Sequence, residues 1–568
     1  MMAAQQIGMV NRCGFKWLAL ASAIVIWGNL NLAHAQAWQV RSQEWTSADE
    51  EGYSTFVQAI GESGCNTPSS CINSDANPLR SGDEWLNFDA DCADLIYLLR
   101  AYYAWKHSLP FTFATAVTSR GRGDIRFSSK GNRIVGRRTI TSGANPRAVF
   151  ETLKDTVSSA MFRVGPGADE NELSDFYPVK IQRGSVRPGT AIYDVNGHVA
   201  IVYKVGKDGR IHYMDAHPDF TLSRSVYGAQ FGRDFPEMGA GFKNFRPFQV
   251  EGGRVKLAAN HQIPDYSTEQ FYGNVNPDPN RDWRQAQFRF EGTTVGYYEY
   301  VRLAMADGRL TFDPVVELRE TIKTLCNDLY DRQRYVEQAI AKGIDRKQHP
   351  SRLPANIYGS DNMEWEIYST PSRDARLKAA FRAMRVDLVR LIELYNAKDP
   401  RINYGGLNLQ SDLKEQYHYS AERCIVVYRN SAGRVITMKL PEVTQRLFKL
   451  SFNPYDCVER RWGATSSEEL ASCANTATEE RWYHAQQGLR NQIDRDYDAR
   501  MDFTVQELEA GGAGTGPSTQ ANVDILSVID GTRMRPVLED NALPPQAQKP
   551  SALKPAAVRT APKVQAVR

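Results

Sequence analysis

The sequence predicts an α+β fold, because one strong helical segment is followed along the chain by closely spaced strands. Apolar residues repeat at helical spacing between residues 92 and 107. From Thr190 to Asp215, three segments rich in β-branched and aromatic residues are separated by Asn-Gly and Asp-Gly, dipeptides typical of hairpin turns. A helix followed by an antiparallel meander is an α+β pattern.

The pattern of turns and apolar residues also sets the order of the elements. We expect a loop-rich stretch up to about residue 88, followed by the helix. The strands of the meander are predicted over residues 190–194, 198–205 and 211–215. The second half is predicted to be mostly helical, with helices at about 314–343, 372–396 and 478–510 and a hairpin around 430–433.

The length of 568 residues predicts more than one domain, because a single hydrophobic core rarely serves so long a chain. We assign residues 36–260 to an α+β catalytic domain and 261–510 to a mainly helical accessory domain. Residues 511–568 are rich in Gly, Pro, Ala and Lys, a composition that predicts a disordered tail. The formal net charge of +3 is small and argues against a nucleic-acid partner.

Residues 1–35 resemble a secretory signal peptide. Arg12 and Lys16 precede an apolar stretch over residues 17–27, and Ala33-His34-Ala35 fits a small-x-small cleavage site. An uncleaved membrane anchor is the rival interpretation, but the apolar stretch is shorter than the roughly 20 residues that span a bilayer. We therefore expect a periplasmic or secreted protein of a bacterial-type cell, without stable membrane insertion after signal removal.

Cysteine number points to one unpaired thiol. Removal of Cys13 with the signal leaves seven cysteines in an oxidising compartment, an odd number. The simplest partition leaves Cys92 free and pairs the others as Cys65 with Cys71, Cys326 with Cys424, and Cys457 with Cys473. Sequence alone leaves this connectivity open.

Cys92 stands at the expected start of a helix, in the segment DADCADL of residues 89–95. Unpaired backbone N–H groups and the helix dipole favour a thiolate there. Asp91 fits the N-cap and Asp94 its capping partner, although their negative charges partly oppose a lower thiol pKa. A buried cysteine that packs as a small hydrophobic residue is the alternative.

His198 opens an apolar strand, where a free imidazole can take the proton of a thiol and deliver it to a leaving amine. A structural histidine is the alternative. If the loop after Val205 has an even number of residues, His198 shares a face with Asp215, which would then orient the imidazole. A one-residue bulge would bring His212 there instead.

Backbone and side-chain donors near Cys92 are candidates for an oxyanion hole. The Cys92 N–H is the first donor, and the side chain of Asn87 or the indole of Trp85 is the second candidate. Farther along the chain, the cation-rich segment from Arg120 to Arg138 is interpreted either as a wall that attracts anionic substrates or as a solvated basic hairpin.

The chain resembles the papain-like NlpC-type cell-wall peptidases over roughly residues 80–220. Asp-Cys-Ala-x-Leu, then Pro-Gly-Thr, then Gly-His-Val-Ala-Ile-Val follow the order of that family's motifs. The resemblance implies a papain-like fold and a Cys92–His198 pair that cleaves amide bonds in peptidoglycan stem peptides, with His212 as the third member.

The same residues also resemble the transglutaminase-like superfamily, in which a cysteine heads a helix, a histidine begins a strand and an aspartate lies on the next strand. That resemblance implies a Cys92, His198 and Asp215 triad and an amine as an alternative acyl acceptor. Both resemblances imply acyl transfer from an amide through a thioester.

Two further expectations complete the sequence-based interpretation. No cofactor and no metal are expected, because no His/Cys/Asp cluster has ligand spacing and no nucleotide-binding loop is present. The rival function is an inactive envelope scaffold whose helical half binds an envelope protein, motivated by Ala93-Asp94 in place of the peptidases' Ser-Gly.

Overall fold

The computed structural model describes residues 37–121, 124–167, 172–355, 362–494 and 500–531. The predicted signal peptide and residues 532–568 of the predicted tail lie outside these ranges. In the first half the elements are α1 (Ser47–Glu62), α2 (Pro68–Ile72), α3 (Cys92–Lys106), β1 (Phe111–Ser119), β2 (Asn132–Ile140), α4 (Pro146–Thr156), β3 (Phe176–Pro178), β4 (Ala191–Asp194), β5 (His198–Val205), β6 (Ile211–Ala216), β7 (Leu222–Val226), β8 (Gly241–Phe245), β9 (Phe248–Glu251) and β10 (Arg254–Leu257).

The rest of the described chain is mainly helical. Its elements are α5 (Glu269–Tyr272), β11 (Phe288–Phe290), β12 (Thr293–Val295), α6 (Tyr297–Met305), α7 (Pro314–Ala341), α8 (Met363–Tyr368), α9 (Pro371–Asn396), α10 (Leu409–Arg423), β13 (Ile425–Arg429), β14 (Val435–Lys439), α11 (Leu440–Arg446), α12 (Val458–Arg461), α13 (Ser467–Leu470), α14 (Ala477–Ala485), α15 (Gln487–Asn491), α16 (Val505–Ala510) and α17 (Leu526–Ile529). No helix of the described ranges is both long enough and apolar enough to cross a membrane.

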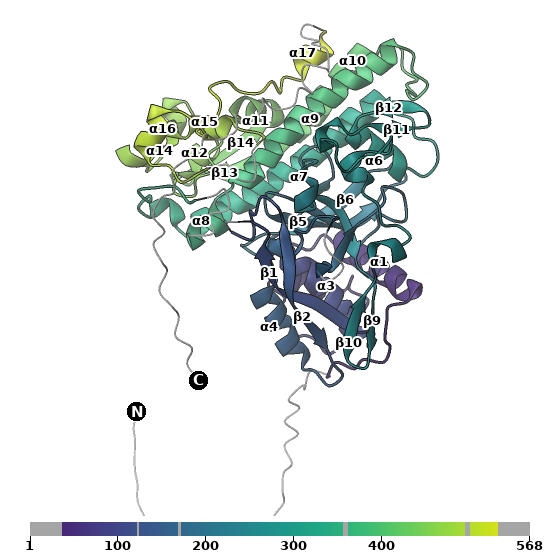
Figure 1. Ribbon diagram of the computed structural model, residues 1–568. Helices are drawn as coiled ribbons and strands as arrows, with labels where there is room; N and C mark the ends of the chain where they lie inside the picture. The colour runs from purple at the N-terminus through teal and green to yellow at the C-terminus, as the bar shows by residue number, and fades with distance from the viewer. Residues whose placement is uncertain (1–36, 122–123, 168–171, 356–361, 495–499, 532–568) are drawn as a thin grey trace, which may run out of the picture.

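A six-stranded antiparallel sheet forms the centre of the first half, in the order β3-β8-β4-β5-β6-β7. The helix and meander predicted from sequence are confirmed within one residue by α3, β4, β5 and β6, so the α+β prediction holds. Helices α1 and α3 pack against β5 on one face of this sheet, whereas α7 contacts β7. Figure 1 shows α7, α9 and α10 above β5 and β6 of this sheet, with the purple and blue N-terminal elements below.

Alternation along the central strands gives the sheet two different cores. Val199, Ile201 and Met214 face the core that contains α1 and α3. Ala200 and Val202 face a second core, to which residues 263–312 contribute apolar side chains. The sequence-based boundary at residue 260 therefore does not coincide with a change of core, because the segment that follows it packs on the sheet.

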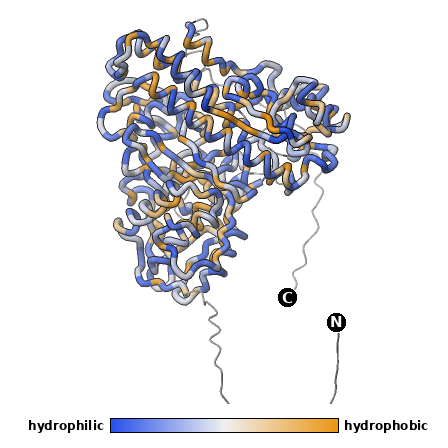
Figure 2. Tube along the Cα trace, turned by 180° about the vertical axis from the view of Figure 1, so that it is seen from behind, coloured by the Kyte–Doolittle hydropathy of each residue, from blue (hydrophilic) through white to orange (hydrophobic). Residues whose placement is uncertain are grey.

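A third core joins α7, α9, α10 and the β13–β14 hairpin, and a fourth joins α14 and α16. Figure 2 shows hydrophobic, orange segments within both the sheet-bearing half and the helical half. Ile525, Val528 and Ile529 are buried in the third core. The prediction of a disordered tail from residue 511 is therefore wrong up to Gly531, because three apolar side chains in that segment reach the α9–α10 surface.

Two other sequence predictions were wrong. The stretch before residue 88 is not merely loop-rich, because α1 occupies Ser47–Glu62 and buries Tyr53, Phe56, Val57 and Ile60 at helical spacing. The single long helix expected at 478–510 is instead α14, α15 and α16, with residues 495–499 outside the described ranges. Its apolar residues contact different cores, which breaks a continuous helix into short segments.

Candidate active site

His198 and Asp215 meet at one end of the sheet. The Nε2 atom of His198 lies 2.6 Å from Oδ2 of Asp215, and both residues are buried. His198 is the first residue of β5, and Asp215 lies near the end of the neighbouring β6. The predicted partnership of these two side chains is therefore present, while His212 lies on the opposite parity of β6 beside the ring of Tyr203.

Asp215 shares the face of His198 as predicted, although the loop before β6 does not have the length on which that prediction depended. The loop between Val205 and Ile211 has an odd number of residues, not an even one, since these two residues are paired directly. A bulge at Tyr203 then shifts the register between Val202 and Lys204. The two single-residue offsets cancel, so that Asp215 rather than His212 shares the face of His198.

Gly61 of α1 makes room for the bulged residue Tyr203. A Cβ atom added to Gly61 would lie 2.2 Å from the Tyr203 ring, so only glycine leaves room for this side chain. Gly61 thus lets the bulged tyrosine pack between the sheet and α1. A glycine within an amphipathic helix looks like a helix breaker in sequence, which explains why α1 was missed.

Cys92 is the first residue of α3, as predicted, and is partly buried. Asp91 and Asp94 form a capping box, in which the Asp91 carboxylate accepts hydrogen bonds from the amides of Ala93 and Asp94. Within the described residues, the Cys92 amide itself donates no hydrogen bond. The cap therefore leaves one backbone donor at the helix start free for a developing oxyanion.

The thiol of Cys92 reaches the sheet where β5 and β6 separate. The β5–β6 ladder extends only to the pair Ile201 and Met214, and the Val199 amide beyond it is a hydrogen-bond donor to the thiol. Cys92 is thereby next to the residue that follows His198. No hydrogen bond between the Cys92 sulfur and the His198 ring is present among the described residues.

The protonation states favour a neutral pair at rest. Burial raises the pKa of the Cys92 thiol well above its ordinary value, and Asp91 adds to this effect against the opposing Val199 amide. Burial lowers the pKa of His198, with Arg376 adding to the effect and Asp215 opposing it. Near neutral pH the site thus holds a thiol and an uncharged imidazole, so the imidazole can act as a base.

Burial and the neighbouring Asp91 carboxylate also raise the pKa of Asp94. Protonation of one carboxyl removes a negative charge next to Cys92. The opposition that two charged aspartates would exert on thiolate formation is therefore smaller than the sequence indicates.

Helices from the second half cover the Asp215 side of the site. Arg376 of α9 places Nη2 4.0 Å from Oδ2 of Asp215. His217 lies parallel to His198 with ring centroids 5.7 Å apart, and its Nε2 is 2.9 Å from the hydroxyl of Ser223. Ser223 in turn donates to Asp215. These neighbours hold the carboxylate in place.

His217 follows Asp215 by two residues, so strand parity places it on the same face, whereas the contribution of Arg376 carried no sequence signal. Burial raises the pKa of Asp215, but His217, His198 and Arg376 outweigh it and keep the net pKa far below its ordinary value. Asp215 is therefore ionised and accepts the Nε2–H of His198, which leaves Nδ1 as the basic nitrogen.

Two groups of side chains have the composition of a metal site. His198, Asp215 and His217 have their ligand atoms within 4.8 Å of one another. Arg376 beside Asp215 repels a cation there, and the Nε2 of His198 is already bonded to the carboxylate. In the second group, Cys457 and Cys473 form a disulfide. Neither set of residues is suited to a metal.

The two side-chain candidates for the oxyanion hole are engaged elsewhere. The Asn87 amide donates to Asp89 at 2.8 Å, and the Trp85 indole donates to the Gly82 carbonyl at 3.2 Å. In each case a hydrogen bond to a residue two or three positions away in sequence satisfies the side-chain donor. The Cys92 and Val199 amides are the donors that the structure directs to the thiol end of α3.

The cysteine prediction is confirmed for the described residues. Cys92 is the free cysteine, and the disulfides are Cys65–Cys71, Cys326–Cys424 and Cys457–Cys473. These pairs are compatible with an exported protein.

The basic segment forms the β1–β2 hairpin. Arg120 and Arg133 pair with Glu172, Arg137 pairs with Asp175, and Arg126 lies 3.7 Å from Glu366. Partners within the chain thus neutralise most of these cations, which favours the interpretation as a structural hairpin over an anion-attracting wall.

Comparison of this chain with protein-family models, with curated proteins and with solved structures found no match in any of the three.

Proposed function

We propose that this chain is an exported cysteine acyl transferase that cleaves amide bonds, with Cys92 as nucleophile, His198 as general base and acid, and Asp215 as the residue that orients the imidazole. The single observation that supports this most directly is the buried 2.6 Å contact between His198 Nε2 and Asp215 at the end of the sheet that Cys92 also reaches. A papain-like topology for residues 36–260 belongs to the same proposal.

The proposed chemistry follows from the protonation states. Nδ1 of His198 accepts the thiol proton as the Cys92 sulfur attacks the amide carbon. The resulting oxyanion receives the free Cys92 amide hydrogen bond. The imidazolium then delivers its proton to the leaving amine, which leaves a thioester on Cys92. Water, deprotonated by His198, hydrolyses the thioester and restores the thiol.

The identity of the third residue bears on the family. A histidine in that role was implied by the NlpC resemblance, and an aspartate on the next strand by the transglutaminase resemblance. Asp215 contacts His198, whereas His212 lies on the other face of the sheet. Both observations support the second resemblance. An amine acceptor in place of water is therefore the second candidate function, and peptide or peptidoglycan-like amides remain the proposed donors.

An inactive scaffold remains the rival, because burial raises the Cys92 pKa and the helical half covers Asp215. Alkylation by iodoacetamide separates the two functions, since Cys92 is the only free cysteine of the described chain. In an active site, the neutral His198 accelerates alkylation at pH 7, and His198→Ala slows it by at least tenfold.

His212→Ala is the matched control, because this histidine lies on the same strand as Asp215 but on the opposite face of the sheet. It should alkylate at the unaltered rate. Equal rates in the unaltered protein, His198→Ala and His212→Ala would favour the scaffold.

A further inference from the structure

A cavity lies between the sheet edge and helices α6, α7 and α9. Its volume is about 270 Å³, room for roughly nine water molecules at about 30 Å³ each. Side chains of two long helices supply an apolar wall that includes Leu318, Leu325, Met384, Leu388 and Leu391. An apolar wall of this extent gives ordered water few partners and favours an organic occupant.

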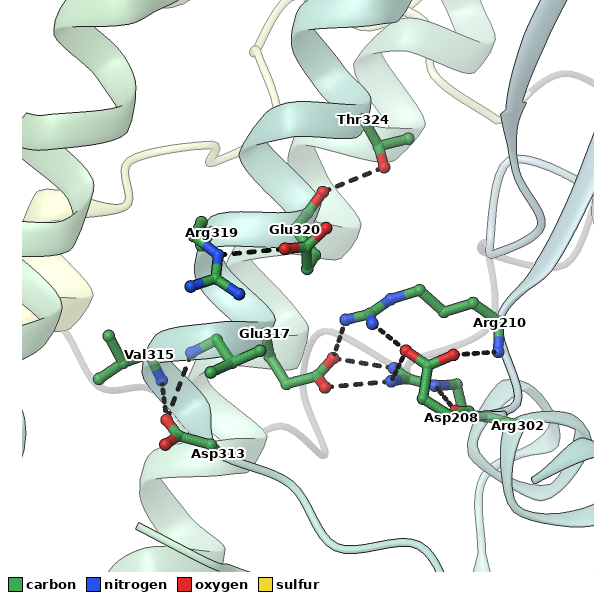
Figure 3. Close-up of polar contacts among 10 residues, drawn as sticks. Asp208, Arg210, Arg302, Asp313, Val315, Glu317, Arg319, Glu320 and Thr324 are labelled. Carbon is green, nitrogen blue, oxygen red and sulfur yellow. Dashed lines mark hydrogen bonds and ion pairs between the residues drawn. The ribbon is translucent and has the colours of Figure 1, made fainter. Parts of the chain in front are cut away.

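The cations at one end of the cavity already have partners. Figure 3 shows Glu317 of α7 between two arginines, 2.8 Å from Arg210 and 2.8 Å from Arg302. Arg210 also pairs with Asp208. Charges in this group balance, since two guanidinium groups face two carboxylates.

A second balanced group lies beside it. Glu299 pairs with Arg401 at 2.6 Å and lies 4.0 Å from Arg390, and Arg401 also pairs with Asp399. Here too, two cations face two carboxylates. Each cation of the two groups therefore already has a carboxylate partner before another acid on the wall is considered.

Asp387 of α9 is such an acid. It lines the cavity and forms no ion pair or hydrogen bond with another residue of the described ranges. Although the Asp387 side chain is exposed, the surrounding protein desolvates its carboxyl and raises its pKa to about 6. Arg302, which already pairs with Glu317, offsets this desolvation only in part.

Asp328 of α7 is a second acid on the wall; it forms no ion pair among the described side chains, although Ser225 contributes a hydrogen bond and Arg376 attracts its carboxyl. Burial raises its pKa to about 8. Asp328 precedes Arg332 by four residues on α7, and Arg332 pairs with Asp374 of α9. Asp387 follows Asp374 by thirteen residues, so two antiparallel helices joined at this pair separate the two acids by about nine residues, about 13 Å at 1.5 Å per residue.

We propose that this cavity binds a linear aliphatic diamine, with its methylene chain along the α7–α9 wall and its two ammonium groups at Asp387 and Asp328. The walls match the apolar chain, and the two carboxylates without ion pairs match charges at its ends. The cavity does not include Cys92, although Asp328 also borders the space beside Asp215.

Isothermal titration of the purified protein with octane-1,8-diamine at pH 7.5 tests the proposal, with octan-1-ol as the uncharged probe of the same chain length. The diamine should bind at least tenfold more tightly than the alcohol, because a charge-assisted hydrogen bond contributes more than a neutral one. Asp387→Asn should weaken diamine binding about tenfold and leave alcohol binding unchanged. Equal affinity for the two probes, or full diamine affinity in Asp387→Asn, would overturn the proposal.

Three further variants keep the test specific. Glu320→Gln is the matched control, because Glu320 lies on the same wall but pairs with Arg319 at 3.0 Å, as Figure 3 shows. It should bind the diamine normally. Ala383→Phe should fill the cavity and abolish binding. Cys92→Ser should bind normally; loss of binding in this variant would place the diamine at the Cys92 site and contradict the proposal.

Discussion

The two faces of the central sheet differ in what their side chains do. Toward α3, the strands present Val199, Ile201 and Met214, which are fully buried and apolar. Toward α7 and α9, the same strands present Asp215 and His217 to arginines from distant parts of the chain. We call the α3 side the apolar face, and the other side, which carries Asp215 beside the apolar core of Ala200 and Val202, the polar face. The apolar face fixes how helix and sheet meet, and the polar face holds the ionisable partners of His198. Substitutions on the two faces should therefore differ in their effects on activity and stability.

The largest expected effect is on the polar face. Asp215→Asn should lower the rate of amide cleavage by about three to four orders of magnitude, because an amide no longer holds His198 in the productive tautomer. Release of free amino groups from purified peptidoglycan measures this rate, and the melting temperature should change by only a few degrees. If His212→Ala proves the more damaging change, the assignment of the third residue is wrong.

The second-largest effect is expected for the buried ion pair that joins α7 to α9, the helices that cover the polar face. Arg332 and Asp374 are joined by two hydrogen bonds and are almost completely buried. Asp374→Leu should reduce the free energy of unfolding by about 3–5 kcal/mol, since it leaves a buried cation without a partner. Urea denaturation measures the loss. The double variant Arg332→Met with Asp374→Leu should recover most of it; failure to recover would assign the loss to packing.

A methylene deletion on the apolar face should be milder. Ile201→Val removes one methylene from a fully buried side chain and should reduce the free energy of unfolding by about 1 kcal/mol. The same urea experiment applies. Amide cleavage should remain unchanged, because this side chain points away from His198. A marked loss of activity at normal stability would contradict the separation of the two faces.

The smallest effect expected is a shift in pH dependence. His198 must be neutral to accept the thiol proton, so activity is present above its lowered pKa and falls as the pH drops through that value. Arg376 contributes to the lowering, so Arg376→Met should move the acid limb of kcat/KM to higher pH by less than one unit. Arg376→Lys, which keeps the charge, should restore the original limb. An unmoved limb in Arg376→Met would limit this arginine to a structural role.

Prediction from sequence succeeded where the signal was local. The capping residues Asp91 and Asp94, the turn at Asn196-Gly197 and the unpaired Cys92 were all legible within a few residues of chain. The parity that selected Asp215 depended on a bulge and a loop length that cancelled, so a correct answer came from two unpredicted details. The short helices after residue 477 were missed because charged residues at helical spacing do not reveal where a chain turns toward another core.

The sequence by itself determined the helix start at Cys92, the strand start at His198 and the cysteine left over from three disulfides, because capping, turn chemistry and parity act between near neighbours. Only the tertiary structure decided what surrounds them. Arg376 reaches Asp215 from 161 positions away, and Asp387 lines a cavity made by elements from three regions of the chain. Burial and distant charges set the pKa values of the site, and both arise when separate segments exclude water from a common interior.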